Sequence, residues 1–155
     1  MSTIHFEFLA DRKDDVPLVM KWWHSFWGRR MGDLDAYTEQ FLAKLGKNEL
    51  PLDIVAISND QPVGTAALKD HEMEEIYPSY QYWMGSIFVA PEERGQGIAR
   101  LLASEIIRLA RQLQLPQIYL QTTDLSGGLY SELGWEPVDR LVYQGEETLV
   151  MVKYL

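Results

Sequence analysis

The sequence predicts an α/β domain whose mixed sheet contains one parallel strand–helix–strand unit, and 155 residues suit a single domain over 1–155. Apolar residues recur at helical spacing from Ile98 to Leu113. Apolar stretches typical of strands precede and follow this segment, at 80–89 and 117–122. Because such a crossover is right-handed, the loop before Ile98 should lie at the carboxyl end of the first strand, where open sheets bind ligands.

The first third of the chain predicts one strand and two helices. Residues 4–9 alternate enough to form a first strand. Acidic residues and Pro17 suit the first turn of a helix that we expect to run to about Trp27 and to break over 28–32. A second helix is expected over 33–45. The first helix has more aromatic side chains than one buried face needs, and we expect some of them to line a substrate cleft: Trp22, Trp23, Phe26 and Trp27.

The middle of the chain predicts a hairpin and then a central strand. Strands over 52–58 and 63–69 are separated by a turn. The acidic segment 70–75 is expected to be a solvated loop, or else the rim of a site for a cation. Gly85, within the strand at 80–89, indicates a bulge or a close approach of another group to the backbone. A short helix and a hairpin are expected to end the fold, over 129–133, 135–143 and 148–154.

Composition excludes several classes of protein. A formal net charge of -9 argues against nucleic-acid binding, which needs a basic face. No apolar stretch is long enough to span a bilayer, and the first residues lack the pattern of a signal peptide, so no membrane partner and a cytoplasmic location are expected. With no cysteine and 3 scattered histidines, no metal site is expected.

Two glycines precede the long helix, in the stretch Arg94-Gly95-Gln96-Gly97-Ile98-Ala99-Arg100. Glycine permits positive φ and lets the backbone approach a ligand closely. The first turn of the helix that follows has unpaired N–H groups, which favour anions. Arg100 stands where the dinucleotide fingerprint has its third glycine, and no Gly-Lys-Ser/Thr follows, so neither that fingerprint nor the P-loop is matched. The loop is therefore expected to bind a phosphate.

This stretch resembles the acyl-CoA loop of the GCN5-related N-acetyltransferase (GNAT) superfamily, Arg/Gln-x-x-Gly-x-Gly/Ala. A second stretch, Leu129-Tyr130-Ser131-Glu132-Leu133-Gly134-Trp135, resembles the family signature Leu-Tyr-x-x-x-Gly-Phe/Trp. The two motifs stand in the family's order, one helix and one strand apart. The resemblance implies a mostly antiparallel central sheet with helices on both faces. It also implies acetyl-CoA as co-substrate.

The resemblance also implies roles for individual residues. Ile87, Phe88 and Val89 would contact the pantetheine of acetyl-CoA through their backbone. The pyrophosphate would be held by Arg94, Gly95, Gln96, Gly97, Ile98, Ala99 and Arg100. Tyr130 corresponds to the tyrosine that reaches the thioester sulfur, as general acid or as hydrogen-bond donor to the thiolate. Thr123 stands where many members have an asparagine, and its hydroxyl is expected to bind the pantetheine amides.

The sequence leaves the general base open. Some members of the family have a glutamate on the central strand, but 80–89 contains no carboxylate. At pH 7, a lysine-like amine with a pKa of about 10.4 loses its proton at a cost of about 4 to 5 kcal/mol, and an α-amino group at about 1 kcal/mol. The candidates for the base are Asp70, His71, Glu72 and Asp124, or a water relayed by backbone carbonyls.

These observations lead us to expect an N-acetyltransferase acting on the primary amine of a small cationic substrate. Transfer is expected to be direct, because no cysteine is present to form an acyl-enzyme. Acetylation of protein or peptide N-termini stays open as an alternative, and so does a catalytically silent acyl-CoA-binding regulatory module. The sequence is compatible with a homodimer but does not establish the oligomeric state.

Overall fold

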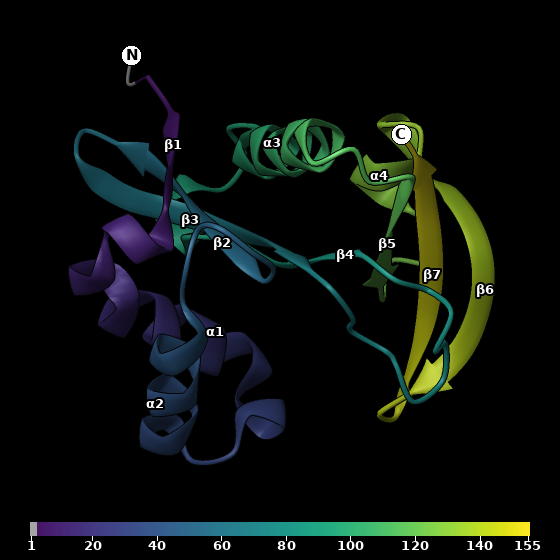
Figure 1. Cartoon of the computed structure of the whole chain (residues 1–155), viewed down its shortest axis with the longest axis horizontal. Helices are drawn as coiled ribbons and strands as arrows, with labels where there is room; N and C mark the ends of the chain where they lie inside the picture. The colour runs from purple at the N-terminus through teal and green to yellow at the C-terminus, as the bar shows by residue number, and fades with distance from the viewer. Residues whose placement is uncertain (1–2) are drawn as a thin grey trace.

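Seven strands form one mixed sheet in the computed structural model, which describes residues 3–155 (Figure 1). The strands are β1 (His5–Phe8), β2 (Leu52–Ser58), β3 (Gln61–Lys69), β4 (Trp83–Val89), β5 (Gln117–Thr122), β6 (Glu136–Tyr143) and β7 (Glu146–Tyr154). Their order across the sheet is β1-β2-β3-β4-β5-β7-β6. All neighbouring pairs are antiparallel except β4 and β5, which are parallel. The mixed sheet with one parallel unit, expected from the sequence, is confirmed.

Helices cover both faces of this sheet. They are α1 (Val16–Met31), α2 (Leu34–Lys44), α3 (Ile98–Gln112) and α4 (Gly128–Glu132), with short 3-10 turns η1 (Leu9–Asp11), η2 (Lys13–Asp15) and η3 (Pro91–Glu93). In Figure 1, α3 and α4 lie on one face, and α1 and α2 lie on the other. The apolar side of α3 packs on Ile54 and Met84, whereas α1 packs on Val55 and Ile57. None of the helices in this part of the chain has the length and apolarity needed to cross a membrane.

The first helix is kinked where its sequence predicts it to end. Trp27 has a non-helical backbone (φ -111, ψ 18), and about one further turn follows this kink and reaches Met31. It ends at Gly32, whose φ of 69 lies in the left-handed region that glycine adopts without strain. Asp33 then caps α2, since its carboxylate accepts a hydrogen bond from the Ala36 N–H at 3.0 Å.

Strands β4 and β5 are joined only at their amino ends. Trp83 and Tyr119 form the one register pair between them, and the Tyr119 N–H donates to the Tyr82 carbonyl at 2.9 Å. Among the described residues, no further pair of β4 and β5 is joined by ladder hydrogen bonds. The carboxyl halves of β4 and β5 are therefore free to separate, which leaves an opening in the middle of the sheet (Figure 1).

A bulge lies in β4 beside this opening. Thr65 pairs with Phe88 and Ala67 pairs with Gly85, so two residues of β4, Ser86 and Ile87, face one residue of β3. Ser86 has a φ of 54, so the irregularity falls one residue after Gly85.

Two buried hydrogen bonds hold the bulge. The Trp23 indole N–H donates to Thr65 Oγ1 at 3.0 Å, and Thr65 Oγ1 donates to the Ser86 carbonyl at 2.8 Å. Thr65 is 1% exposed, so both bonds are shielded from water. One member of the aromatic cluster on α1 therefore positions the central strand and does not line a cleft.

The acidic loop between β3 and β4 is not simply a solvated loop. Met73 is fully buried within it, with Trp83 and Val150. Tyr80 stacks on Tyr119 of β5, with ring centroids 4.3 Å apart. The sequence-based reading of a solvated segment is therefore wrong for this part of the loop, because one methionine and the following tyrosines anchor it to the sheet.

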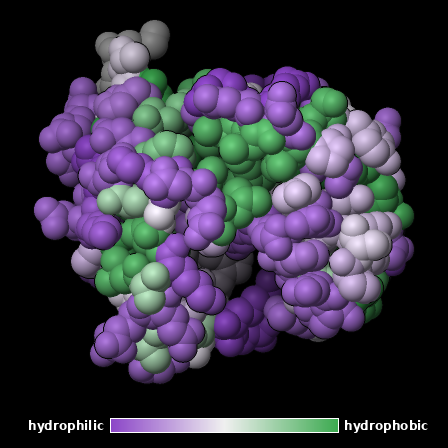
Figure 2. Space-filling model, viewed as in Figure 1, coloured by the Kyte–Doolittle hydropathy of each residue, from purple (hydrophilic) through white to green (hydrophobic). Residues whose placement is uncertain are grey.

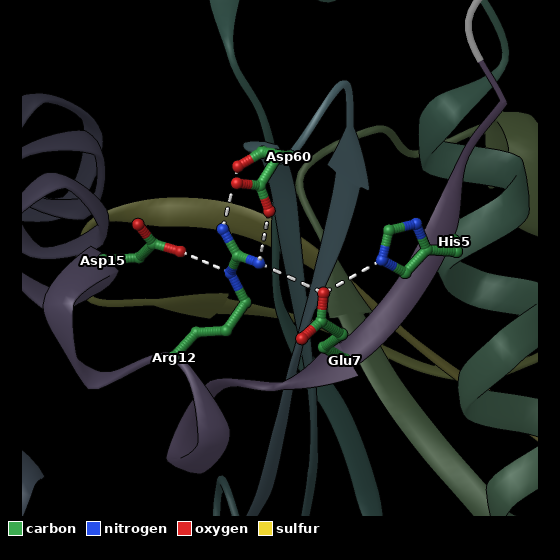
Figure 3. Close-up of polar contacts among 5 residues, drawn as sticks. All are labelled: His5, Glu7, Arg12, Asp15 and Asp60. Atoms are coloured by element: carbon green, nitrogen blue, oxygen red, sulfur yellow. Dashed lines mark hydrogen bonds and ion pairs between the residues drawn. The ribbon is translucent and has the colours of Figure 1, made fainter.

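An ion-pair network joins the amino end of α1 to the sheet (Figure 3). Arg12 donates from Nε to Asp15 at 2.6 Å and from Nη1 to Glu7 of β1 at 3.1 Å. Its Nη2 donates to the carbonyl of Asp60, in the turn between β2 and β3, at 3.0 Å. One guanidinium thus joins three segments and sets where α1 begins.

Candidate active site

A groove of about 430 Å³ runs between the carboxyl end of β4 and the start of α3. It is lined by Phe26, Ile87, Phe88, Val89, Glu93, Arg94, Gly95, Gly97, Ile98, Ala99, Arg100 and Leu129. The sequence-based list for acetyl-CoA thus falls on one groove, apart from Gln96 and Thr123, which are not among its lining residues. Sequence reasoning missed Glu93 and Leu129 as wall residues, although Leu129 directly precedes Tyr130 in the second motif.

The glycine loop has the backbone that an anion site needs. Gly95 and Gly97 have φ values of 81 and 80, which side-chain-bearing residues rarely adopt. Gly97 is the N-cap of α3, and no side chain caps this helix end. The first N–H groups of α3, at residues 98–100, therefore have no intrahelical acceptor and face the groove side of the loop.

The two arginines of the loop are already engaged with protein groups. Arg94 Nε donates to the Val89 carbonyl at 3.0 Å, and its guanidinium lies 5.4 Å from the centre of the Phe88 ring. Arg100 donates from Nη2 to Glu132 of α4 at 2.7 Å. Both side chains are exposed enough to move, so each could exchange its present partner for a phosphate.

Phe26 of α1 lines this groove, and two further aromatic residues of α1 pack on Phe88, which also lines it. Trp22 stacks on Phe88 at 5.8 Å, and Trp27 contacts the same ring edge-on at 6.2 Å. Phe26 is 69% exposed and lies among the groove-lining residues. Phe26 therefore lines the groove beside the glycine loop, and the expectation that part of the aromatic cluster lines a substrate cleft stays a prediction.

Tyr130 follows the glycine pair 127–128 on α4 and faces Trp135, with ring centroids 6.2 Å apart. Burial raises the pKa of Tyr130 above its usual value of about 10, so the phenol is protonated at neutral pH. Within residues 3–155, the hydroxyl makes no hydrogen bond to another group. A half-buried tyrosine with an unengaged hydroxyl can donate to a ligand without breaking an internal bond.

The structure places the carboxylate of Glu72 against the central strand β4, which has no carboxylate of its own. A side chain at Gly85 would collide with Glu72 Oε2, so the carboxylate lies directly on the backbone of β4. Gln121 of β5 donates to Glu72 Oε1 at 2.7 Å. Gly85 and Gln121 each lie two residues beyond the Trp83–Tyr119 pair, so Glu72 spans the point where β4 and β5 separate.

The second oxygen of this carboxylate is free of hydrogen bonds. Glu72 Oε2 is buried without a hydrogen-bond partner in the described chain, and Lys69 Nζ lies 3.6 Å away. The close approach of Glu72 to the backbone thus explains the glycine at position 85, in agreement with one of the two interpretations of a glycine within this strand. A carboxylate with one oxygen held by a hydrogen bond and the other without one is suited to accept a proton.

The other candidates for the base lie elsewhere or have other tasks. Asp70 accepts a hydrogen bond from Gln81 at 2.7 Å and is half-exposed. The ring of His71 lies 3.7 Å from Asp70, and its Nδ1 is buried without a partner in the described chain. Asp124 is fully exposed, and hydrogen bonds from Ser126 lower its pKa below the usual value. The carboxylate of Glu72, by contrast, lies against the backbone of β4.

One face of the molecule is hollowed. Figure 2 shows a recess between the part of the molecule that contains α1 and α2 and the part that contains β6 and β7. It opens below β4, on the face away from α3. Among residues 3–155, no group of three or more histidine, aspartate or glutamate side chains could hold a metal ion.

A family model matches this chain over residues 16–135 and is described as the acetyltransferase (GNAT) family. The match covers more than half of the chain and includes both sequence motifs and Glu72. No curated protein matches at a significant level.

Solved structures with the same fold cover nearly the whole chain. A ribosomal-protein-alanine N-acetyltransferase from Brucella melitensis is 20% identical, with a TM-score of 0.76, and covers 99% of each chain. Mutant forms of the spermidine/spermine N-acetyltransferase SpeG from Vibrio cholerae are 18% identical, with a TM-score of 0.75, over 98% of this chain and 95% of that one. The protein yncA from Salmonella typhimurium, with its cofactor acetyl-CoA, is 19% identical, with a TM-score of 0.74, over 99% and 94%. At these identities, the likeness establishes the fold.

Proposed function

The chain belongs to the GNAT family of acetyl-CoA-dependent acetyltransferases, and we propose that it transfers the acetyl group directly to the primary amine of a small cationic substrate. The single observation that carries the proposal is the carboxylate of Glu72 on the backbone of Gly85. It supplies a base on the acceptor side of β4, and a base is what this reaction needs most.

The groove beside β4 fits acetyl-CoA by its chemistry. Ile87, Phe88 and Val89 present strand backbone to it, and the start of α3 presents N–H groups without intrahelical acceptors. Arg94 and Arg100 would turn from their present partners toward the phosphates. Acetyl-CoA supplies an acetyl group activated as a thioester, and the groove would hold it along β4 toward Gly85.

Glu72 would remove the proton that prevents attack. A protonated amine has no lone pair, and restoring it at pH 7 costs about 4 to 5 kcal/mol for an alkylamine. The acceptor would reach Glu72 Oε2 by displacing the flexible side chain of Lys69, while Gln121 keeps Oε1 in place. The amine nitrogen then forms its bond to the acetyl carbon, and the carbon–sulfur bond breaks. The carboxylate keeps the first proton, and the second proton, which the nitrogen loses as it becomes an amide, goes to the departing thiolate to give the free thiol of CoA.

Tyr130 would stabilise the sulfur that leaves. A tyrosine with a pKa of about 10 is a weaker acid than a thiol with a pKa of about 8.5, so full proton transfer costs about 2 kcal/mol. Because burial raises the pKa of Tyr130 further, we assign it a hydrogen bond to the developing thiolate in place of complete transfer. Its unengaged hydroxyl supports this role.

A cationic acceptor agrees with the charges on the loop before β4. Glu72, Glu74 and Glu75 lie on the loop that borders β4, and the chain has a net charge of -9. Solved structures of similar fold include enzymes named for spermidine and for ribosomal-protein alanine, so both small amines and peptide N-termini are worth testing. The catalytically silent acyl-CoA-binding module, left open by the sequence, is disfavoured by the presence of Glu72.

A thiol-release assay tests the proposal. We expect turnover of acetyl-CoA with polyamines, aminoglycosides or arylalkylamines, and mass spectrometry should find one acetyl group on a nitrogen of the product. Higher kcat/KM with short peptides would favour the N-terminal alternative. Binding of acetyl-CoA without turnover against the whole panel would contradict the proposed enzyme and favour the silent module.

A further inference from the structure

A second carboxylate lies on the same face of the sheet as Glu72, outside the machinery described above. Asp53 of β2 is 4% exposed. Its neighbours two and four residues on, Val55 and Ile57, pack with α1, so alternation along the strand directs Asp53 to the face covered by α1 and α2. An aspartate this deeply buried usually has a partner, since an unpaired buried charge is costly.

The carboxylate of Asp53 opens on a small pocket between α2 and the start of β2. The cavity has a volume of about 180 Å³ and is lined, besides Asp53, by Tyr37, Gln40, Phe41, Lys44, Leu45 and Pro51. Within residues 3–155, Asp53 accepts no hydrogen bond. The pocket thus combines aromatic and apolar walls with one buried anionic group that lacks a hydrogen-bond donor.

The charges near Asp53 do not neutralise it fully. Burial raises the pKa of Asp53 to about 6, against the attraction of Lys69, so the group is mostly ionised at pH 7. Lys69 is shared, since its Nζ lies 3.6 Å from Glu72 Oε2. Lys44 and Tyr37 of α2 line the same pocket, and within residues 3–155 neither makes a hydrogen bond or ion pair to the carboxylate. A site with a buried anion and too little positive charge favours a cationic ligand.

We propose that this pocket binds the primary ammonium group of an alkylamine, with Asp53 as its anion and Tyr37 and Phe41 as its aromatic walls. An ammonium ion would supply the hydrogen-bond donors that Asp53 lacks. The carbon chain of the amine would lie against Leu45 and Pro51. A single carboxylate without further acidic side chains does not suit a metal ion.

Two kinds of ligand could supply the ammonium group. Asp53 and Gly85 both pair with Ala67, on its two sides, so they lie two strand spacings apart, about 10 Å. One source is the far end of a diamine whose near end is acetylated beside Glu72. The other is a separate amine that never enters the acetylation site. In both cases a primary ammonium group occupies the pocket.

Binding is tested by NMR without acetyl-CoA, so the result does not depend on the proposed reaction. With n-hexylamine, we expect the amide signals of 40–45 and 53 to shift in the wild-type protein and in Glu72→Gln, but not in Asp53→Asn. Neutral n-hexanol is the matched ligand control. Gln40→Lys, which places an ammonium group inside the pocket and keeps Asp53, should also abolish the shifts. Unmoved signals in the wild-type protein, or equal shifts in Asp53→Asn, would overturn the proposal.

The pH dependence gives an independent check. An ammonium ion binds the ionised carboxylate, and Asp53 becomes protonated as the pH falls through about 6. We expect the affinity for n-hexylamine at this site to fall about tenfold between pH 7 and pH 5, since the ionised fraction falls by about that factor. An affinity that stays constant over this range would contradict the role of Asp53.

Kinetics separate the two sources. Hexamethylenediamine and n-hexylamine differ only in the second ammonium group. If the pocket holds the far end of the acceptor, Asp53→Asn raises KM about tenfold for the diamine and leaves KM for the monoamine unchanged. If the ligand is a separate amine, neither KM changes while the NMR shifts are still lost.

Discussion

The two sides of β4 are built in different ways. The donor groove comes mainly from one continuous segment, 87–100, whose groups are backbone N–H donors, glycines and a helix end. The acceptor side comes from four segments, which contribute Lys69, Glu72, Gly85 and Gln121. A site made of backbone can be specified locally, whereas a site made of side chains depends on the whole fold.

This difference predicts separate kinetic effects. Variants on the donor side should change the KM for acetyl-CoA, because they alter a binding surface. Variants on the acceptor side should change kcat and leave acetyl-CoA binding intact, because they alter a proton acceptor. The four changes below test that separation, in order of decreasing effect.

Glu72→Gln should have the largest effect. Removal of a general base costs about 10² to 10⁴ in rate, and we expect kcat/KM for the amine to fall about 10³-fold at pH 7. The loss should shrink as the pH rises, since the free amine becomes more abundant without help. Initial rates at several pH values, together with acetyl-CoA binding by calorimetry, measure both effects.

Glu74→Gln is the matched control for this change, because Glu74 lies on the same loop and its side chain is exposed. It should keep wild-type rates. If Glu72→Gln also kept them, the base would have to be another group, and the assignment of the acceptor side to Glu72 would be wrong.

Tyr130→Phe tests the point where the two sides meet. The ring and its contact with Trp135 are kept, and only the hydroxyl is removed. We expect kcat to fall well over tenfold and the affinity for acetyl-CoA to stay nearly unchanged, because the hydroxyl acts on charge that develops in the transition state. Tyr154→Phe, at a 65% exposed site, should change neither quantity. Full activity of Tyr130→Phe would remove this residue from the mechanism.

The same contrast explains what the sequence could predict. The parallel unit around α3, the glycine loop and the second motif follow from local patterns, since periodicity and glycine positions are visible in consecutive residues. The Glu72–Gly85 contact is not visible, because 13 positions separate the two residues and the loop's path depends on buried Met73. Strand β4 itself lacks a carboxylate, as its sequence says, and the fold supplies one from the neighbouring loop.

The end of α1 shows a smaller difference. The helix kinks at Trp27, directly before Gly28, but tertiary packing of the aromatic residues carries a further turn beyond the kink to Met31. Propensity is a small energy, about 1 kcal/mol for a glycine, and the burial of a Trp side chain exceeds it. Helix ends are therefore set by glycines that require positive φ, as at Gly32, more than by glycine as such.

Gly97→Ala tests the donor side. No atom lies within 4 Å of the position that the new Cβ would take, so the only cost is a side chain at φ 80. That cost is about 1 to 2 kcal/mol, and we expect the KM for acetyl-CoA to rise about tenfold with little change in kcat. Gly46→Ala is the control, since its Cβ is also unhindered and its φ is not positive. A fall in kcat alone would contradict the separation of the two sides.

Glu132→Gln should have the smallest effect, and it tests whether Arg100 is held away from the phosphate. The Arg100–Glu132 pair measures 2.7 Å, but its side chains are 48% and 65% exposed, so its loss should change stability by less than about 1 kcal/mol. Freed from this partner, Arg100 could bind an anion, and the KM for acetyl-CoA should fall about twofold. Glu105→Gln removes a comparable ion pair to Arg108, outside the groove lining, and should leave that KM unchanged. A higher KM in Glu132→Gln would mean that the ion pair positions Arg100 for the phosphate instead of competing with it.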